Sequence, residues 1–207
     1  MNRWKRLGFL SMLIWLTGCT AFQTSNELHK GRGALLGGTP DAAVTHFTQV
    51  TALNGNARYS QLQEGAWTYL GRAYYDAKKY PQAHQALERA VAINGDDSFA
   101  RLYLGLTLAR QGDYETGRKE VLLGLKGLYD SLHYIAYNTS TGMYWDATGQ
   151  IRTELQATQS DVQAANPNLD PLFARLETLG IRIEQEIDAA SRDESRERNR
   201  RGGGGDD

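Results

Sequence analysis

One pattern of apolar and small residues occurs twice in this chain, 34 residues apart. The first copy consists of Trp67, Leu70, Gly71, Tyr74, Ala83, Leu87 and Ala90, and the second of Leu104, Gly105, Leu108, Gly117, Val121 and Gly124. Apolar residues three or four positions apart share one face of a helix, so each copy predicts two amphipathic helices joined by a turn. Its small residues predict that the two helices pack closely. Such a hairpin cannot bury its apolar face alone, and we therefore expect neighbouring units to stack into a solenoid.

The spacing W-x2-L-G-x2-Y, followed by a small residue and then a bulky apolar one, resembles the tetratricopeptide repeat, a helix-turn-helix unit. Two unrelated amphipathic hairpins are the alternative, and the shared offset disfavours it. A degenerate first copy lies at 26–55, where Gly31 and Ala43 have the spacing of Gly71 and Ala83. The resemblance implies an all-α solenoid of about three helical hairpins over residues 26–131, with C-terminal capping helices at 150–195.

The N-terminal residues 1–19 have the features of a secretory signal. Basic residues precede an apolar run from Leu7 to Leu16. A run of ten residues is too short to cross a bilayer, which needs about 20 helical residues. The end, Leu16-Thr17-Gly18-Cys19, resembles the lipobox of bacterial lipoproteins, which implies that Cys19 is acylated, with palmitate or a similar chain, and becomes the new N-terminus. The alternative is a signal peptide with a chance cysteine near its cleavage site.

The residue after the cysteine bears on localisation. In Gram-negative lipoproteins an aspartate there resembles an inner-membrane retention signal, and this chain has Thr20 instead. The resemblance therefore implies the periplasmic face of the outer membrane. The short polar segment 20–25 is predicted to be a tether between the lipid and the first helix.

Composition and motifs disfavour several classes of function. With 23 Lys plus Arg against 24 Asp plus Glu, the chain lacks the basic balance of a nucleic-acid binder. A single cysteine cannot form a disulfide within the chain. The four histidines form no metal-binding motif, and neither a phosphate-binding loop nor a nucleophile elbow is present. We predict a protein that is not an enzyme and binds no metal or cofactor.

The concave face of a tetratricopeptide solenoid is built from the first helix of each unit. Projection from the repeat pattern places these candidate partner-binding residues on that face: Arg72, Tyr75, Asp76, Phe99, Leu102, Leu106 and Arg110. They have two interpretations. They form a groove for an amphipathic helix or an extended peptide, or the C-terminal helices of the same chain cover them. We favour the second, because exposed apolar patches are uncommon on soluble surfaces.

The remainder of the chain is predicted in three parts. Residues 132–149 read as a loop rich in aromatics, in which Tyr144 and Trp145 are either recognition residues or, more commonly, residues that pack the loop onto the scaffold. Within 150–195, an apolar stripe from Leu172 to Ile187 predicts a capping helix, with self-association as the alternative. Residues 196–207 are predicted to be disordered.

Together these features predict a membrane-anchored periplasmic lipoprotein that acts as a protein-protein interaction scaffold or assembly adaptor for an envelope complex. Its partner would be a protein or peptide of the cell envelope, and it would contact the membrane through the Cys19 lipid. Two alternatives remain open: a self-associating structural lipoprotein, which would be a homo-oligomer, and a cell-wall-polymer binder that uses Tyr137, Tyr144 and Trp145.

Overall fold

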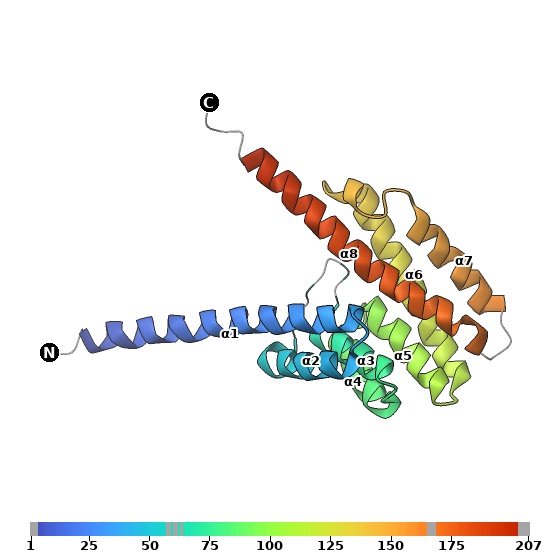
Figure 1. The fold of residues 1–207 in the computed structure, drawn as a ribbon, viewed down its shortest axis with the longest axis horizontal. Helices are drawn as coiled ribbons and strands as arrows, with labels where there is room; N and C mark the ends of the chain where they lie inside the picture. Colours follow the sequence, from blue (N-terminus) through green and yellow to red (C-terminus); the bar gives the residue numbers. More distant parts are fainter. Residues whose placement is uncertain (1–3, 57–58, 60–61, 63, 165–168, 203–207) are drawn as a thin grey trace.

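The computed structural model describes residues 4–56, 59, 62, 64–164 and 169–202, with only the helical backbone described for 4–19 and 202. Three helical hairpins follow one another in the chain (Figure 1). Their helices are α1 (Trp4–Leu36) and α2 (Pro40–Asn54), α3 (Ala66–Asp76) and α4 (Tyr80–Ile93), and α5 (Ser98–Arg110) and α6 (Tyr114–Asn138). The predicted all-α solenoid of three hairpin units is confirmed.

The turn inside each hairpin has the same backbone geometry. Gly38, Lys78 and Gly112 occupy equivalent positions and have φ angles of 70°, 59° and 96°. In each turn this residue donates its amide hydrogen to the carbonyl three residues earlier, which ends the first helix of the unit. This left-handed conformation favours glycine, so Lys78 is the exception among the three. The same turn therefore joins the two helices of each unit, although the helices differ in length.

Glycines bring the paired helices close together. A Cβ atom on Gly105 of α5 would lie 2.5 Å from the carbonyl oxygen of Gly117 and 2.6 Å from the amide nitrogen of Val121, both in α6. A Cβ atom on Gly71 of α3 would lie 2.4 Å from Cγ of Leu87 in α4. The small residues of the sequence pattern therefore stand where two helices touch, as the pattern predicts.

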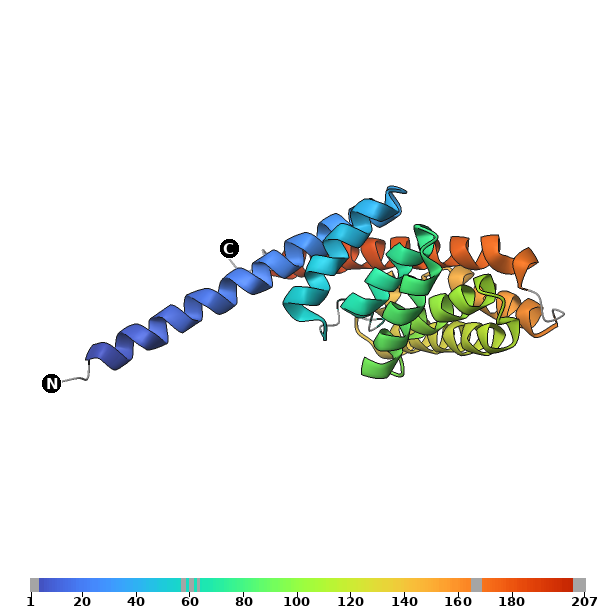
Figure 2. The ribbon, with the colours of Figure 1, turned by 90° about the horizontal axis from the view of Figure 1, so that it is seen from below.

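Two C-terminal helices complete the fold. α7 (Gln150–Ala164) packs on α6, and α8 (Phe173–Gly202) runs across the first helices of the three hairpins (Figures 1 and 2). Short 3-10 turns, η1 (Gly142–Tyr144) and η2 (Asp170–Leu172), precede α7 and α8. The apolar stripe of α8 joins the main hydrophobic core, so this helix lies along the concave face and does not cap the end of the solenoid.

Three predicted boundaries differ from the structure. Residues 20–25, the expected tether, continue α1 as a helix. The expected loop at 132–149 begins later, because Leu132 and Ile135 extend the buried stripe of Leu125 and Leu128 and keep α6 helical to Asn138. Of the expected disordered tail, residues 196–202 belong to α8, where i,i+3 and i,i+4 pairs such as Arg201 with Glu197 support the helix. Residues 203–207 lie outside the described part.

In the part of the chain whose side chains are described, which begins at residue 20, no helix is long and apolar enough to cross a membrane.

Candidate functional site

Each first helix of the three hairpins contributes one arginine that meets a carboxylate of α8. These ion pairs are Arg32 with Asp188 at 2.6 Å, Arg72 with Glu184 at 2.7 Å, and Arg110 with Glu177 at 3.2 Å. The order is reversed along α8, so this helix runs from the third hairpin back to the first. The polar residues of the concave face therefore fix the register of the C-terminal helix.

The central ion pair is a buried cluster. The Arg72 guanidinium is 2% exposed, and its Nη1 donates to Glu64 Oε1 at 2.5 Å and to Glu184 Oε2 at 2.7 Å. Its Cζ lies 4.8 Å from the ring centroid of Phe99 and 5.1 Å from that of Tyr103. A cation enclosed by aromatic faces and carboxylates holds the fold together and is not available to a ligand.

The two carboxylates of this cluster differ in their pKa values. Burial, together with the negative charge of Glu184, raises the pKa of Glu64 to about 8. Burial alone would also raise the pKa of Glu184, but Arg72 and Arg32 outweigh it and hold that pKa below its usual value. Glu184 is therefore the charged partner of the two arginines at neutral pH, whereas Glu64 binds a proton over much of the neutral range.

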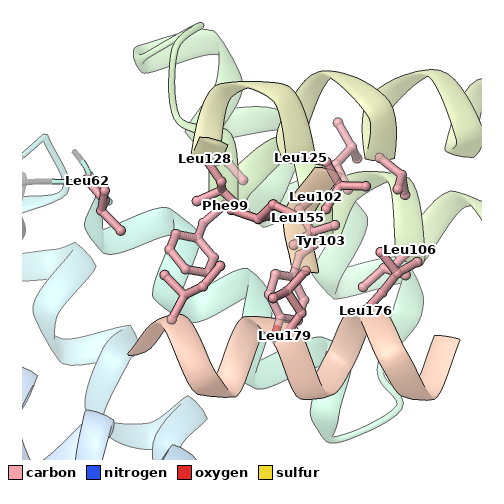
Figure 3. Close-up of a cluster of buried hydrophobic side chains, with 14 of the residues drawn as sticks. Leu62, Phe99, Leu102, Tyr103, Leu106, Leu125, Leu128, Leu155, Leu176 and Leu179 are labelled. Atoms are coloured by element: carbon pink, nitrogen blue, oxygen red, sulfur yellow. The ribbon is translucent and has the colours of Figure 1, made fainter. Parts of the chain in front are cut away.

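The apolar candidates on the concave face are covered. Phe99, Leu102 and Leu106 have no exposed surface, and they belong to one buried cluster with Leu155 of α7 and with Leu176 and Leu179 of α8 (Figure 3). The interpretation as an open apolar groove is therefore wrong in this conformation, and the alternative that the C-terminal helices cover these residues is confirmed. The same contacts bury the apolar stripe from Leu172 to Ile187, on which the self-association hypothesis rests.

Aromatic residues around η1 have separate environments. Trp145 is 1% exposed, and its Nε1 donates to Glu194 Oε1 at 2.7 Å. Tyr144 is half-buried against the main core. The interpretation of Trp145 as a recognition residue is corrected, because its ring packs the chain onto α8. Tyr137 is 69% exposed but belongs to α6, so these three residues do not form one exposed aromatic surface.

A part of the concave face remains open beside α8. It is a groove of about 440 Å³ at the C-terminal ends of the first helices. Its walls are Leu35, Leu36, Gly38, Pro40, Tyr75, Asp76, Lys78, Tyr80, Tyr103, Arg110, Glu177 and Ile181. Three sequence candidates, Tyr75, Asp76 and Arg110, come together here. We take this groove as the candidate functional site.

Hydrogen bonds fix one wall of the groove. The Tyr75 hydroxyl donates to Glu177 Oε1 at 2.7 Å, and Arg110 Nη2 donates to the same oxygen at 3.2 Å. The Arg110 guanidinium also lies 3.8 Å from the ring centroid of Phe173. Burial raises the pKa of Tyr75, so its hydroxyl stays protonated as a donor at any physiological pH. This wall is thus preformed before a ligand arrives.

The groove also combines a carboxylate with apolar surface. Asp76 is exposed at the mouth, yet the protein around its carboxylate removes hydrating water and raises its pKa to about 6. No ion pair of Asp76 is found among the described residues. Leu36 and Ile181 are 39% and 47% exposed. The groove therefore offers an acid near two aliphatic side chains, which suits a ligand with a basic group and an apolar neighbour.

Several residues of this groove are absent from the predicted site. Leu36 ends α1 and Lys78 lies in the turn after α3. The repeat register, which aligns Leu36 with Asp76 and Lys78 with Gly38, could have indicated both. It could not have indicated Ile181, because the position of that residue depends on where α8 crosses the hairpins. Within the described parts of the chain, no three His, Cys, Asp or Glu side chains are grouped so as to hold a metal ion.

The fold and its groove define a class, the helical-hairpin repeat solenoids. Within it, the sequence matches the tetratricopeptide repeat family in two overlapping segments, 29–94 and 68–132. Together they cover 29–132, half of the 207 residues, and the chain belongs to this family. Proteins of this family typically act as scaffolds for protein partners and not as catalysts. No curated protein and no solved structure matched the chain.

Proposed function

We propose that this protein is a lipid-anchored tetratricopeptide scaffold that holds a protein partner at the periplasmic face of the bacterial outer membrane. The lipobox-like end at Cys19 supports the anchor, and Thr20 supports the outer membrane. The open groove beside α8 supports partner binding and is the observation that carries the proposal. The scaffold would assemble or position an envelope complex through this groove.

Displacement of α8 is too costly to be the way a partner binds. Leu176, Leu179 and Ile183 of α8 have no exposed surface. Burial of an aliphatic side chain contributes about 1.5–3 kcal/mol, so these three alone hold the helix with several kcal/mol. A partner that gains access by removing α8 would have to replace this energy and the ion pairs of three arginines. The surface that α8 leaves open is therefore the place for a partner.

The groove indicates the chemistry of the partner segment. A Lys or Arg side chain next to Asp76 would compensate for the hydration that this carboxylate has lost, and a hydrogen bond to a charged group contributes about 1.5–3 kcal/mol. An aliphatic or aromatic neighbour would cover Leu36 and Ile181. A short segment that combines a basic and an apolar residue thus fits the groove.

In-cell crosslinking tests the binding site. A photoreactive residue replaces Ile181 in the groove, and the control replaces Leu123, which is 49% exposed on α6. The proposal expects a discrete crosslinked complex with another envelope protein from position 181 and none from position 123. Equal, diffuse crosslinking from both positions would argue against a defined site.

Fractionation tests the anchor independently. The Cys19→Ala chain should leave the membrane fraction, and the mass of the processed wild-type N-terminal peptide should include acyl chains on Cys19. A Cys19→Ala chain that still sediments with the membrane would refute the lipid anchor and leave the groove untouched.

A further inference from the structure

The end of the first hairpin nearest Cys19 has an exposed aromatic side chain. Phe22 is 78% exposed, the largest exposure among the bulky apolar side chains described. It lies in α1, three residues after Cys19. Residues three apart on a helix lie on neighbouring positions of one face, and the axial rise between them is about 4.5 Å. An aromatic ring exposed to water at this position favours contact with another apolar surface.

The described side chains of two segments at this end also lack charge. It is formed by the start of the described side chains in α1, residues 20–26, and by the end of α2 with the following turn, residues 48–56. Neither segment contains Asp, Glu, Lys, Arg or His. Along α1 the first charged residue after this segment, Glu27, is buried and pairs with Lys30 at 2.9 Å and with His46 at 2.7 Å. Arg58, which follows the second segment, lies outside the described residues. The described side chains of the two segments can therefore approach a low-dielectric phase without burying an unpaired charge.

The two segments enclose a shallow hollow of about 310 Å³ that opens at the same end. Its lining mixes hydroxyl and amide groups with apolar atoms: Thr20, Ala21, Thr24, Ser25, Leu28, Leu53, Asn54 and Tyr59. A surface with neutral polar groups, an aromatic ring and no charge is typical of the boundary between lipid headgroups and acyl chains.

We propose that this end of the first hairpin, with Phe22 as its apolar contact, rests on the lipid headgroups and holds the solenoid upright on the membrane. The inference rests on the proposed lipidation of Cys19, which would bring Phe22 to the bilayer. It goes further because α1 continues from Cys19 without a flexible tether. The protein does not swing on its anchor: a second contact fixes its orientation.

This orientation determines how far the partner-binding groove lies from the membrane surface. Leu36, which lines the groove, is 14 residues beyond Phe22 in the same helix. At about 1.5 Å per residue this places the groove about 21 Å from the contact with the membrane. Helix α1 thus acts as a spacer between the lipid surface and the partner-binding groove.

Cysteine accessibility tests the contact. The processed protein is purified from membranes and reconstituted into vesicles of phosphatidylethanolamine and phosphatidylglycerol. Gln23→Cys reports on the proposed contact, and His29→Cys, exposed on the same helix, is the matched control. With a bulky hydrophilic maleimide we expect labelling at position 23 to be at least tenfold slower than at position 29. Detergent should remove the difference.

A second substitution isolates the role of Phe22. Because the ring is exposed, Phe22→Ser should leave the fold intact, which equal labelling of both positions in detergent would verify. In vesicles it should accelerate labelling at position 23 while the protein stays bound through Cys19.

The outcomes separate the contact from the anchor. Equal labelling at 23 and 29 in vesicles, with Cys19 unreactive towards the maleimide, would overturn the contact and leave lipidation standing. A reactive Cys19, or a protein that does not remain with the vesicles, would overturn the lipidation proposal and this inference with it.

Discussion

Replacement of Arg72 by Met gives the sharpest test of how α8 is held. Methionine replaces the aliphatic part of the side chain but removes the guanidinium, which lies over the rings of Phe99 and Tyr103 and pairs with Glu64 and Glu184. Loss of one partner of a buried ion pair costs about 3–5 kcal/mol, because the remaining charge stays buried without compensation. Arg32 still contacts Glu184 at 2.5 Å, so we expect the lower end, about 3 kcal/mol at pH 7.5.

The pH dependence distinguishes an electrostatic loss from a packing loss. In the wild type the lowered pKa of Glu184 contributes stability that is present above its unfolded pKa and disappears as the pH falls through the folded one. Without Arg72 the pKa of Glu184 in the folded protein should rise above its unfolded value of about 4.3. The cost of burying the uncompensated Glu184 charge would then decrease as the pH falls toward that value. The destabilisation by Arg72→Met should therefore be smaller at pH 5 than at pH 7.5.

Urea unfolding followed by circular dichroism at both pH values measures this difference. Arg101→Met is the matched control, because Arg101 pairs with Glu120 at 2.8 Å with both side chains partly exposed. That change should cost less than about 1 kcal/mol. A loss below about 1 kcal/mol for Arg72→Met at pH 7.5, or the same loss at pH 5, would refute the description of a buried, charged cluster.

Four further substitutions test the fold. Glu64→Gln should gain stability relative to the wild type as the pH rises from 5 to 8. Over this range the folded wild type, with a Glu64 pKa of about 8, keeps a proton that the unfolded chain releases, so wild-type stability falls as the pH rises; parallel pH profiles would contradict this. Gly105→Ala should lower the unfolding free energy by more than about 2 kcal/mol, since its Cβ would meet backbone atoms at 2.5 and 2.6 Å, whereas Gly33→Ala, with nothing within 4 Å, should raise it by about 0.5–1 kcal/mol. Ile183→Ala should cost about 2–5 kcal/mol in the same unfolding assay because the side chain is fully buried.

The repeat units were predictable because their signal is local. Gly71 and Gly105 mark the places where two helices touch, and the offset between them fixes the hairpin repeat. Helix periodicity shows which residues share a face, and this was enough to group Tyr75, Asp76 and Arg110 on the concave side. All three line the open groove.

The covering helix was predictable only in part. The stripe from Leu172 to Ile187 indicates a helix with an apolar face, but the sequence does not say which surface it covers. That surface is selected by contacts between residues far apart in the chain, such as Arg72 with Glu184. For this reason Arg72 was placed on a partner-binding surface, whereas the structure has it buried.

The start of the loop after the third hairpin was mispredicted for a different reason. The aromatic residues of 132–149 predict a loop, but Tyr134 and Tyr137 are exposed residues of α6 at 62% and 69%. The buried residues of this stretch, Leu132 and Ile135, continue the helical spacing. Exposed aromatics thus obscured a pattern that the buried residues alone would have shown.

The most direct test of a partner-binding groove is the crosslinking yield from position 181 in cells that carry Asp76→Asn. The control is Asp41→Asn, since Asp41 lies next to the groove residue Pro40 but is 78% exposed and already paired with Lys79. We expect Asp76→Asn to reduce the crosslinked complex several-fold and Asp41→Asn to leave it unchanged. An undiminished complex in the Asp76→Asn protein would contradict the proposal that this groove recognises a basic partner segment.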